Sequence, residues 1–115
     1  MGCAFCDYAG PSKIIHASAD TFVIEPVNPV VSGHVLVVPR EHVETFAERP
    51  AVTARVMEVA AMWVSRNYQH CNVIVNMGRH AGQTVPHLHV HVVPRSAYDG
   101  LKMPWSDQRR EEKVD

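Results

Sequence analysis

The stretch HLHVHVV at residues 87–93 decides how this chain folds and what chemistry it carries. Alternate side chains of a strand point to opposite faces, so His87, His89 and His91 share one face at a spacing of about 6.6 Å. The residues between them are apolar, and a proline flanks the run at each end, which suits the ends of a strand. A core strand has no structural need for three imidazoles, whereas imidazole can act as a nucleophile, a general acid or base, or a metal ligand. The pattern therefore predicts a strand over 87–93 with a functional face, and the alternative is the solvated face of an edge strand.

Two further stretches stand upstream in a fixed order: NPVVSGHVLVVPREH at 28–42 and NMGRHAGQTVP at 76–86. Together with residues 87–93 they resemble the histidine-triad (HIT) family, whose signature is His-φ-His-φ-His-φ-φ with φ apolar. The first resembles the family's strand that carries Gly-His and ends in Pro-Lys/Arg-x-His. The second resembles its glycine-rich approach to the triad. The resemblance extends from Cys3 to Trp105, which is nearly the whole chain.

The residue pattern predicts one compact α+β unit. Short strands are expected over 14–16, 21–25, 34–38, 72–75 and 87–93, and the 34–38 strand is apolar enough to be buried on both faces. A helix is expected over 51–68 after Pro50, which suits a first helical position. Its apolar stripe consists of Val52, Val56, Val59 and Trp63. The family resemblance implies a HIT-like fold with a five-stranded antiparallel sheet, one long helix and a short helix, in a domain over 1–105 followed by a charged tail over 106–115.

Composition excludes several classes of protein. The 115 residues are 46% hydrophobic, which is enough for one core, and the formal net charge of −1 offers no basic excess for a nucleic-acid backbone. No apolar stretch approaches the roughly 20 residues that span a bilayer. We therefore expect no nucleic-acid or membrane partner. The N-terminus lacks the pattern of a signal peptide, and the odd count of three cysteines favours a reducing, cytoplasmic location.

The resemblance implies attack at phosphorus through a covalent nucleotidyl-histidine. Imidazole suits this role because it is both a nucleophile and, once phosphorylated, a leaving group. The catalytic residues would be His89 as nucleophile and His91 as a donor to the α-phosphate. The family's phosphate-side and neighbouring-strand positions correspond to Asn76, Gln83, Thr84 and His34. Taken singly, each of these four residues also fits a purely structural role, as a turn, strand-end or core residue.

A second constellation is the Cys3-x-x-Cys6 pair near the N-terminus. Two thiolates suit a tetrahedral zinc site, which needs two further ligands. Zinc-bearing, bacterial-type members of the family use a histidine after the 34–38 strand and the first triad histidine, which correspond here to His42 and His87. The resemblance thus implies a structural zinc ion. A redox Cys-x-x-Cys and two free thiols are the alternatives.

The nucleobase pocket is implied by the resemblance alone. The family stacks the base of a purine nucleotide or nucleotide conjugate among apolar residues, which correspond here to Phe5, Tyr8, Ile24 and Val27; ordinary core is the alternative. One position departs from the family. Pro26 stands where an Asp or Asn usually holds the ribose hydroxyls, and proline offers no side-chain hydrogen bond.

These observations predict a hydrolase or transferase that acts on the α-phosphate of a nucleoside phosphoramidate or similar conjugate. A dinucleoside polyphosphate hydrolase is the second candidate, and a nucleotide-binding module with negligible turnover is the third. A homodimer is also expected. The helix carries a second apolar surface made of Met57, Ala60, Ala61 and Val64, and a five-stranded sheet leaves an open edge.

Overall fold

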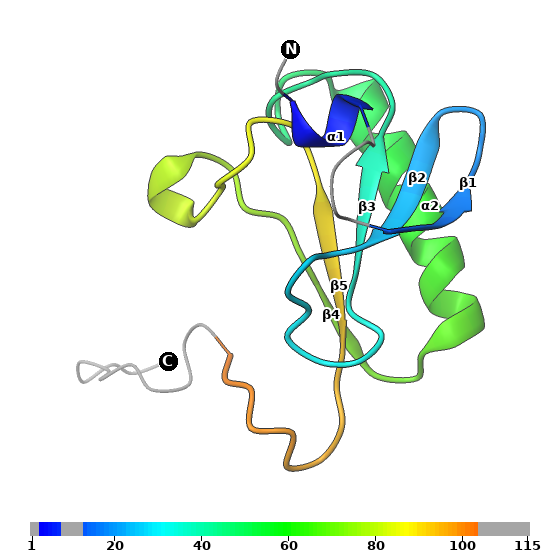
Figure 1. Ribbon diagram of the computed structural model, residues 1–115, viewed down its shortest axis with the longest axis vertical. Coiled ribbons are helices and arrows are strands. Elements are labelled where there is room, and N and C mark those ends of the chain that lie inside the picture. Colours follow the sequence, from blue (N-terminus) through cyan, green and yellow to red (C-terminus); the bar gives the residue numbers. More distant parts are fainter. Residues whose placement is uncertain (1–2, 8–12, 104–115) are drawn as a thin grey trace, which may run out of the picture.

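Five strands form one antiparallel sheet in the order β1-β2-β3-β5-β4 (Figure 1). The computed structural model describes residues 3–7 and 13–103. The expected five-stranded antiparallel sheet with one long helix and a short helix is confirmed. Along the chain the elements are α1 (Ala4–Asp7), β1 (Lys13–Ala17), β2 (Thr21–Glu25), β3 (Val35–Pro39), α2 (Pro50–Asn67), β4 (Cys71–Ile74), the 3-10 turn η1 (Arg79–Ala81) and β5 (Val90–Pro94).

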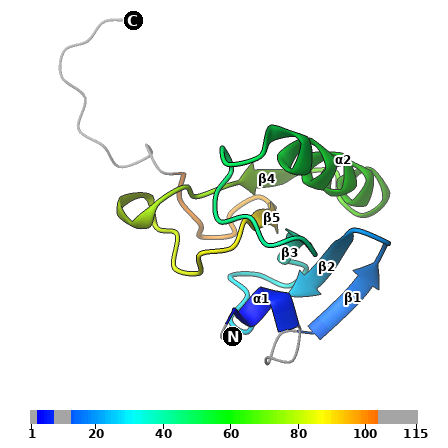
Figure 2. The ribbon, with the colours of Figure 1, turned by 90° about the horizontal axis from the view of Figure 1, so that it is seen from above.

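The sheet separates two apolar cores, because α2 covers one face and α1 lies over the other (Figure 2). The central strand β3 is buried along its whole length, as predicted, and its side chains alternate between the two cores. The first core lies under α2 and consists of Val23, Val35, Val37, Val43, Val56, Val59, Ala60, Leu88, Val90 and Val92. The second core lies on the opposite face, which we call the histidine face, and consists of Phe5, Phe22, Ile24, Leu36 and Val38.

Helix α2 follows the predicted stripe and begins at Pro50. Val56 and Val59 are buried, and Trp63 packs against the first core. Beyond the C-terminal end of α2, the Tyr68 hydroxyl accepts a hydrogen bond from Trp63 Nε1 at 3.1 Å and donates one to the Gly33 carbonyl at 2.5 Å. The helix is thus fixed to the turn that enters β3. In the described part of the chain, no helix is both long and apolar enough to cross a bilayer.

The predicted strand over 87–93 is shorter than expected, because β5 begins at Val90. The last register pair with β3 joins Val90 to Val37, and continued pairing would bring Leu88 opposite Pro39, which has no N–H to donate. Instead, the Leu88 amide donates to the Val43 carbonyl at 2.8 Å. Side-chain alternation nevertheless continues, because Leu88 and Val90 both lie in the first core. The three histidines therefore point away from α2.

Candidate functional site

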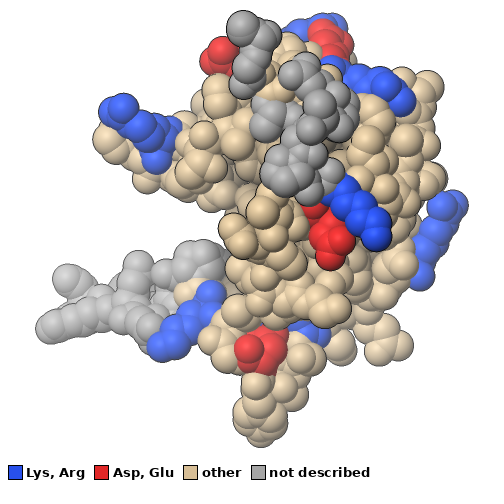
Figure 3. Space-filling model, in the orientation of Figure 1, with Lys and Arg blue, Asp and Glu red and all other residues tan. Residues whose placement is uncertain are grey.

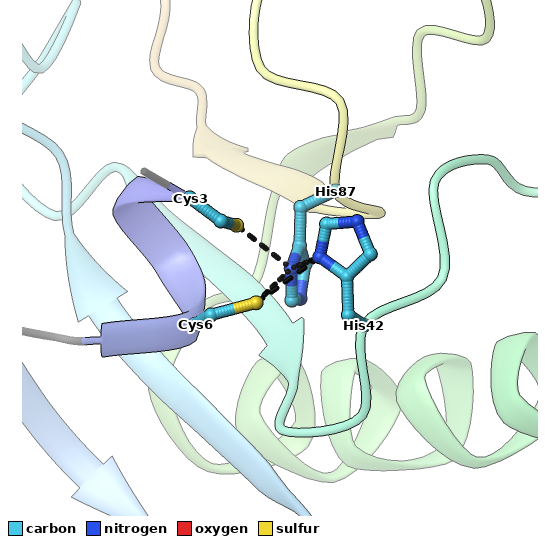
Figure 4. Close-up of side chains that lie close together, drawn as sticks. All are labelled: Cys3, Cys6, His42 and His87. Atoms are coloured by element: carbon cyan, nitrogen blue, oxygen red, sulfur yellow. Dashed lines mark hydrogen bonds between the residues drawn. The ribbon is translucent and has the colours of Figure 1, made fainter. Parts of the chain in front are cut away.

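Four side chains from three distant segments of the chain meet near the end of β3 (Figure 4). Cys6 lies in α1 and Cys3 directly precedes that helix, whereas His42 comes from the loop after β3 and His87 from the segment before β5. Cys6 Sγ lies 3.0 Å from His42 Nδ1, Cys3 Sγ lies 3.3 Å from His87 Nδ1, and the two Nδ1 atoms are 3.1 Å apart. All four donor atoms lie within 4.8 Å of one another.

This set fits a zinc ion. A tetrahedral zinc separates nitrogen ligands by about 3.3 Å and nitrogen from sulfur by about 3.5 Å, close to the separations in the cluster. His87 Nε2 donates to the Pro39 carbonyl at 2.9 Å, which leaves a lone pair on Nδ1, directed at the other three ligands. Burial lowers the pKa of His87, so the ring is kept in the neutral form that a metal requires. The carbonyl partner also orients the ring, as outer-shell partners of metal ligands do.

The middle histidine has the geometry of a nucleophile. His89 is 7% exposed, and its Nδ1 lies 2.8 Å from the His87 carbonyl oxygen. Because a carbonyl oxygen only accepts, His89 Nδ1 must carry the proton, and Nε2 is left with a lone pair. The ring is flanked by the rings of Phe5 and His91, with centroids 5.1 and 5.2 Å away. The free lone pair is what attack at an electrophilic centre requires.

The third histidine is held in the opposite tautomer by a relay that begins in the backbone. The Val30 amide donates to His34 Nδ1 at 3.1 Å, so His34 carries its proton on Nε2. His34 Nε2 then donates to His91 Nδ1, also at 3.1 Å, which places the proton of a neutral His91 on Nε2. Burial lowers the pKa of His91 to about 4, with smaller contributions from His89 and His34, and burial also lowers the pKa of His34. The relay therefore presents a neutral N–H donor beside His89.

The loop between β4 and the triad is held together by Asn76 and Gln83. Asn76 Nδ2 donates to the Ala81 carbonyl at 2.8 Å. Gln83 uses both ends of its amide: Oε1 accepts from the Gly78 amide at 2.8 Å, and Nε2 donates to two carbonyls, those of Glu44 at 2.7 Å and Val85 at 3.0 Å. The structure thus places Gln83 as a brace of the loop, whereas Thr84 lies on the surface of the same loop.

The residues expected to form the base pocket lie at very different depths. Phe5 and Ile24 belong to the second core and are 7% and 1% exposed, so Ile24 leaves almost no surface for a base. Val27 is 57% exposed in the loop after β2, and Tyr8 falls outside the described residues. Pro26 follows directly after β2 in the same loop.

A groove of about 720 Å³ begins at His34 and His91 and runs along β4 and the end of β5. Figure 3 shows this side of the molecule hollowed between the η1 arm and the segment after β5. Its described lining contains two histidines, two asparagines, one arginine and one lysine but no carboxylate, which suits an anionic ligand. The lining residues are Val30, His34, Asn72, Val73, Ile74, Val75, Asn76, His91, Val93, Arg95, Leu101, Lys102 and Met103.

Arg95 is a structural residue of this groove that the sequence motifs do not reveal. It forms a two-point ion pair with Asp99, at 2.7 and 3.0 Å, and donates to Asn72 Oδ1 at 2.6 Å and to the Leu101 carbonyl at 2.9 Å. These bonds hold the 96–103 segment against β4. The spacing of four residues between Arg95 and Asp99 is a weak signal for this role, because such pairs are common on protein surfaces.

Comparisons with known proteins agree with this architecture. A family model of the HIT domain matches residues 9–98. An uncharacterised HIT-like protein of Methanocaldococcus jannaschii is 32% identical over 106 residues, covering 85% of this chain and 82% of that protein. A bifunctional bis(5'-adenosyl)-triphosphatase/adenylylsulfatase of Arabidopsis thaliana is 30% identical over 95 residues, covering 77% of this chain and 53% of that enzyme. The crystal structure of a Zn-bound histidine triad family protein from Mycobacterium smegmatis is similar with a TM-score of 0.77 and 29% identity, covering 98% of this chain and 85% of that one.

Proposed function

This chain belongs to the histidine-triad (HIT) family, and on that premise we propose that it is a hydrolase or transferase acting on the α-phosphate of a nucleotide conjugate. A nucleoside phosphoramidate is the substrate class that we favour. One observation carries the proposal: His89 Nδ1 donates to the His87 carbonyl, so the Nε2 lone pair stays available for attack. The neutral His91 beside it supplies a donor for the phosphate.

The proposed reaction has two displacements. In the first, His89 Nε2 forms a bond to the α-phosphorus while the bond from phosphorus to the leaving group breaks. The leaving group departs with the electron pair and takes a proton from solvent. In the second, water attacks phosphorus and the P–N bond breaks, releasing a nucleoside monophosphate and a proton. Dividing one difficult displacement into two easier ones is the benefit of a covalent intermediate.

Transition-state charge would be stabilised by donors that are already in place. Since phosphoryl transfer depends chiefly on positioning and on donors aimed at the phosphoryl oxygens, the relay through His34 to His91 suits this task. Asn76, Gln83 and Thr84 belong to the proposed phosphate side. Because the amide of Gln83 is used within the loop, we assign it the role of fixing the loop that carries Thr84.

A structural zinc ion held by Cys3, Cys6, His42 and His87 is part of the proposal. Its chemistry would be a crosslink, because all four positions of a tetrahedral site are occupied by protein ligands. His87 would then be a structural ligand that orients the catalytic segment, and it would take no part in proton transfer. The similarity to a Zn-bound family member supports this assignment.

The nucleoside would bind on the histidine face near Phe5, Tyr8, Ile24 and Val27. Val27 would form a wall of this pocket because it is exposed, and Phe5 and Ile24 would lie beneath it because they are buried in the second core. Glu25 does not replace the missing ribose contact: strand alternation sends its side chain to the face of Val23, in the first core, away from the histidines. We also propose that the protein is a cytoplasmic homodimer that binds purine nucleotides.

Relative rates on three substrates test the proposed substrate class. The substrates are an aminoalkyl-linked AMP, AMP-morpholidate and a diadenosine polyphosphate, compared as kcat/KM per chain. We expect the two P–N substrates to react faster. A preference for the diadenosine polyphosphate would instead favour the second candidate, which the similarity to the Arabidopsis enzyme supports. Binding of AMP without turnover of any of the three would contradict both and leave a nucleotide-binding module.

A further inference from the structure

Helix α1 cannot hold its own position. It has four residues, and the hydrogen bond recorded at its start runs from the Cys6 amide to the Cys3 carbonyl at 3.2 Å. Isolated helices shorter than about 12 residues are marginal in water, so the location of α1 depends on its tertiary anchors. Two of these anchors are the Cys3 and Cys6 thiols, which Figure 4 shows directed at the two ligand histidines.

The third anchor is Phe5, which lies between the two cysteines in the sequence and points into the second core. It is only 7% exposed. Its ring meets His87 edge to face at a centroid distance of 5.9 Å and meets His89 at 5.1 Å. The Phe5 side chain therefore connects the 3–6 segment, which supplies two of the four cluster residues, with the imidazole of His89, the proposed nucleophile.

The His89 ring needs such a neighbour. One hydrogen bond, from Nδ1 to the His87 carbonyl, fixes one edge of the ring, and the Phe5 and His91 rings flank the remainder. Protein interiors are close-packed, so removing a phenyl ring beside the imidazole would leave space into which it can turn. A turned ring would lose the bond to the carbonyl, and with it the tautomer that keeps the lone pair on Nε2.

We propose that Phe5 is a positioning residue for His89, and that the cluster of Cys3, Cys6, His42 and His87 acts on the nucleophile by holding Phe5 in place. This inference rests on the proposed function and deepens it. It gives Phe5 a role other than contact with the nucleobase, for which a side chain so deeply buried has little free surface.

Kinetics of Phe5→Ala and Phe5→Leu separate the two roles. Misplacing a nucleophile by about 1 Å costs on the order of 100-fold in rate, so we expect kcat to fall by ~10- to 100-fold in Phe5→Ala and less in Phe5→Leu, with KM changed by less than about threefold. The loss should be equal for a nucleoside phosphoramidate and for ribose 5-phosphoramidate, which has no base. A rise in KM that is confined to the substrate with a base would overturn the proposal and make Phe5 a base contact.

A matched control is Phe22→Ala, because Phe22 is a buried phenylalanine of the same second core, on β2. It should lower the melting temperature by an amount similar to that of Phe5→Ala. It should leave kcat within about twofold of the original protein, because the rings that flank His89 are those of Phe5 and His91. An equal loss of kcat in both variants would show a general effect of the cavity and would contradict a specific role for Phe5.

Nitrogen NMR of the His89 ring tests the inference without any substrate, so it is informative even if none of the substrates above is turned over. In the metal-loaded protein we expect a single tautomer with the proton on Nδ1, bonded to the His87 carbonyl. Phe5→Ala with its metal retained, and Cys6→Ser without metal, should both give mixed tautomers or broadened signals. An unchanged single tautomer in these two variants would overturn the proposal while leaving the proposed reaction intact.

Discussion

At the scale of single residues, three histidines of one face differ in the hydrogen bonds of their ring nitrogens. What separates them is the partner of the second ring nitrogen. His87 donates from Nε2 to a carbonyl and turns Nδ1 to the cysteines and His42, whereas His89 donates from Nδ1 and keeps the lone pair on Nε2. His91 accepts at Nδ1 from His34 and so presents an N–H. Tautomer control by the second nitrogen is a general property of functional histidines.

The relay predicts how His34 affects the rate. Removing one donor from a site that stabilises developing charge costs on the order of 100-fold, so His34→Leu, which unlocks the His91 tautomer, should lower kcat by ~10- to 100-fold with little change in KM. His34→Gln, whose amide can still donate, should recover part of the loss. Steady-state kinetics measures both effects. His80→Ala, which removes an exposed histidine of η1, is the control, and an equal effect of this variant would contradict the relay.

The lowered pKa of His91 makes stability dependent on pH. The unfolded chain binds a proton at this ring as pH falls below about 6.5, whereas the folded protein does so only near a pKa of about 4. The unfolded state therefore gains more protons in this window, and the free energy of unfolding decreases as pH falls from 6.5 towards 4. The melting temperature of His91→Gln should fall less between pH 7.5 and 5 than that of the original chain. If the melting temperatures of the two proteins fell equally with pH, this would contradict the burial of a neutral His91 ring.

The sequence predicted which functional side chains come together better than it predicted the contacts that hold the site in place. The Cys3, Cys6, His42 and His87 set could be predicted because the four side-chain types match one metal geometry and the family motif fixes their order. The two-sided bracing by Gln83 could not be predicted, because its three bonds are to backbone atoms of the folded loop. The contact of Phe5 with His89 likewise depends on where α1 docks, which no local pattern encodes.

At the scale of elements, the side chains before β5 alternate between the two faces of the sheet as they would in a strand, although the strand itself begins later. The spacing in 87–93 predicted one shared face correctly, although β5 begins only at Val90. The helix bounds were predicted within one residue because Pro50 and the apolar stripe both mark α2. The predicted start of the last strand at His87 was wrong. The observed start of β5 depends on Pro39 of the neighbouring strand, and sequence periodicity carries no information about that pairing.

Metal content tests how α1 is held. Protein purified without chelator should contain about one zinc per chain, as expected for a closed Cys₂His₂ site. Cys6→Ser should lose the metal and lower the melting temperature by several degrees, because α1 then loses two thiolate anchors at once. The control is Cys71→Ser, on β4, which should keep the zinc. Absence of zinc with both Cys3 and Cys6 freely titratable would refute the site.

At the scale of the whole molecule, apolar surface remains on α2 and on the open edge of the sheet. The predicted second helix surface is mostly wrong, because Ala60 lies in the first core and Met57 and Val64 pack against it. Only Ala61 of that set is exposed, and Met62 beside it is 44% exposed. The edge strand β4 exposes Val73 at 43%. Helix α1 does not cover this helix face, because it lies on the opposite side of the sheet (Figure 2).

Light scattering at micromolar concentration tests the homodimer. We expect about twice the chain mass of 12.8 kDa, because a two-fold contact would cover both α2 and the β4 edge. Val73→Lys should shift the mass towards that of one chain. The matched control is Ile15→Lys, since Ile15 is 40% exposed on β1 at the other edge of the sheet. A single-chain mass for the unaltered protein would end the dimer hypothesis.

The most direct test of the central claim is the site of the covalent intermediate. Protein mixed with a nucleoside phosphoramidate and quenched under denaturing, non-acidic conditions should carry a nucleotidyl group that peptide mass spectrometry maps to His89. His89→Ala should give neither adduct nor turnover while still binding AMP, because only the nucleophile is removed, and the His80→Ala control should keep both. An adduct on His87 or His91, or full turnover by His89→Ala, would contradict the account.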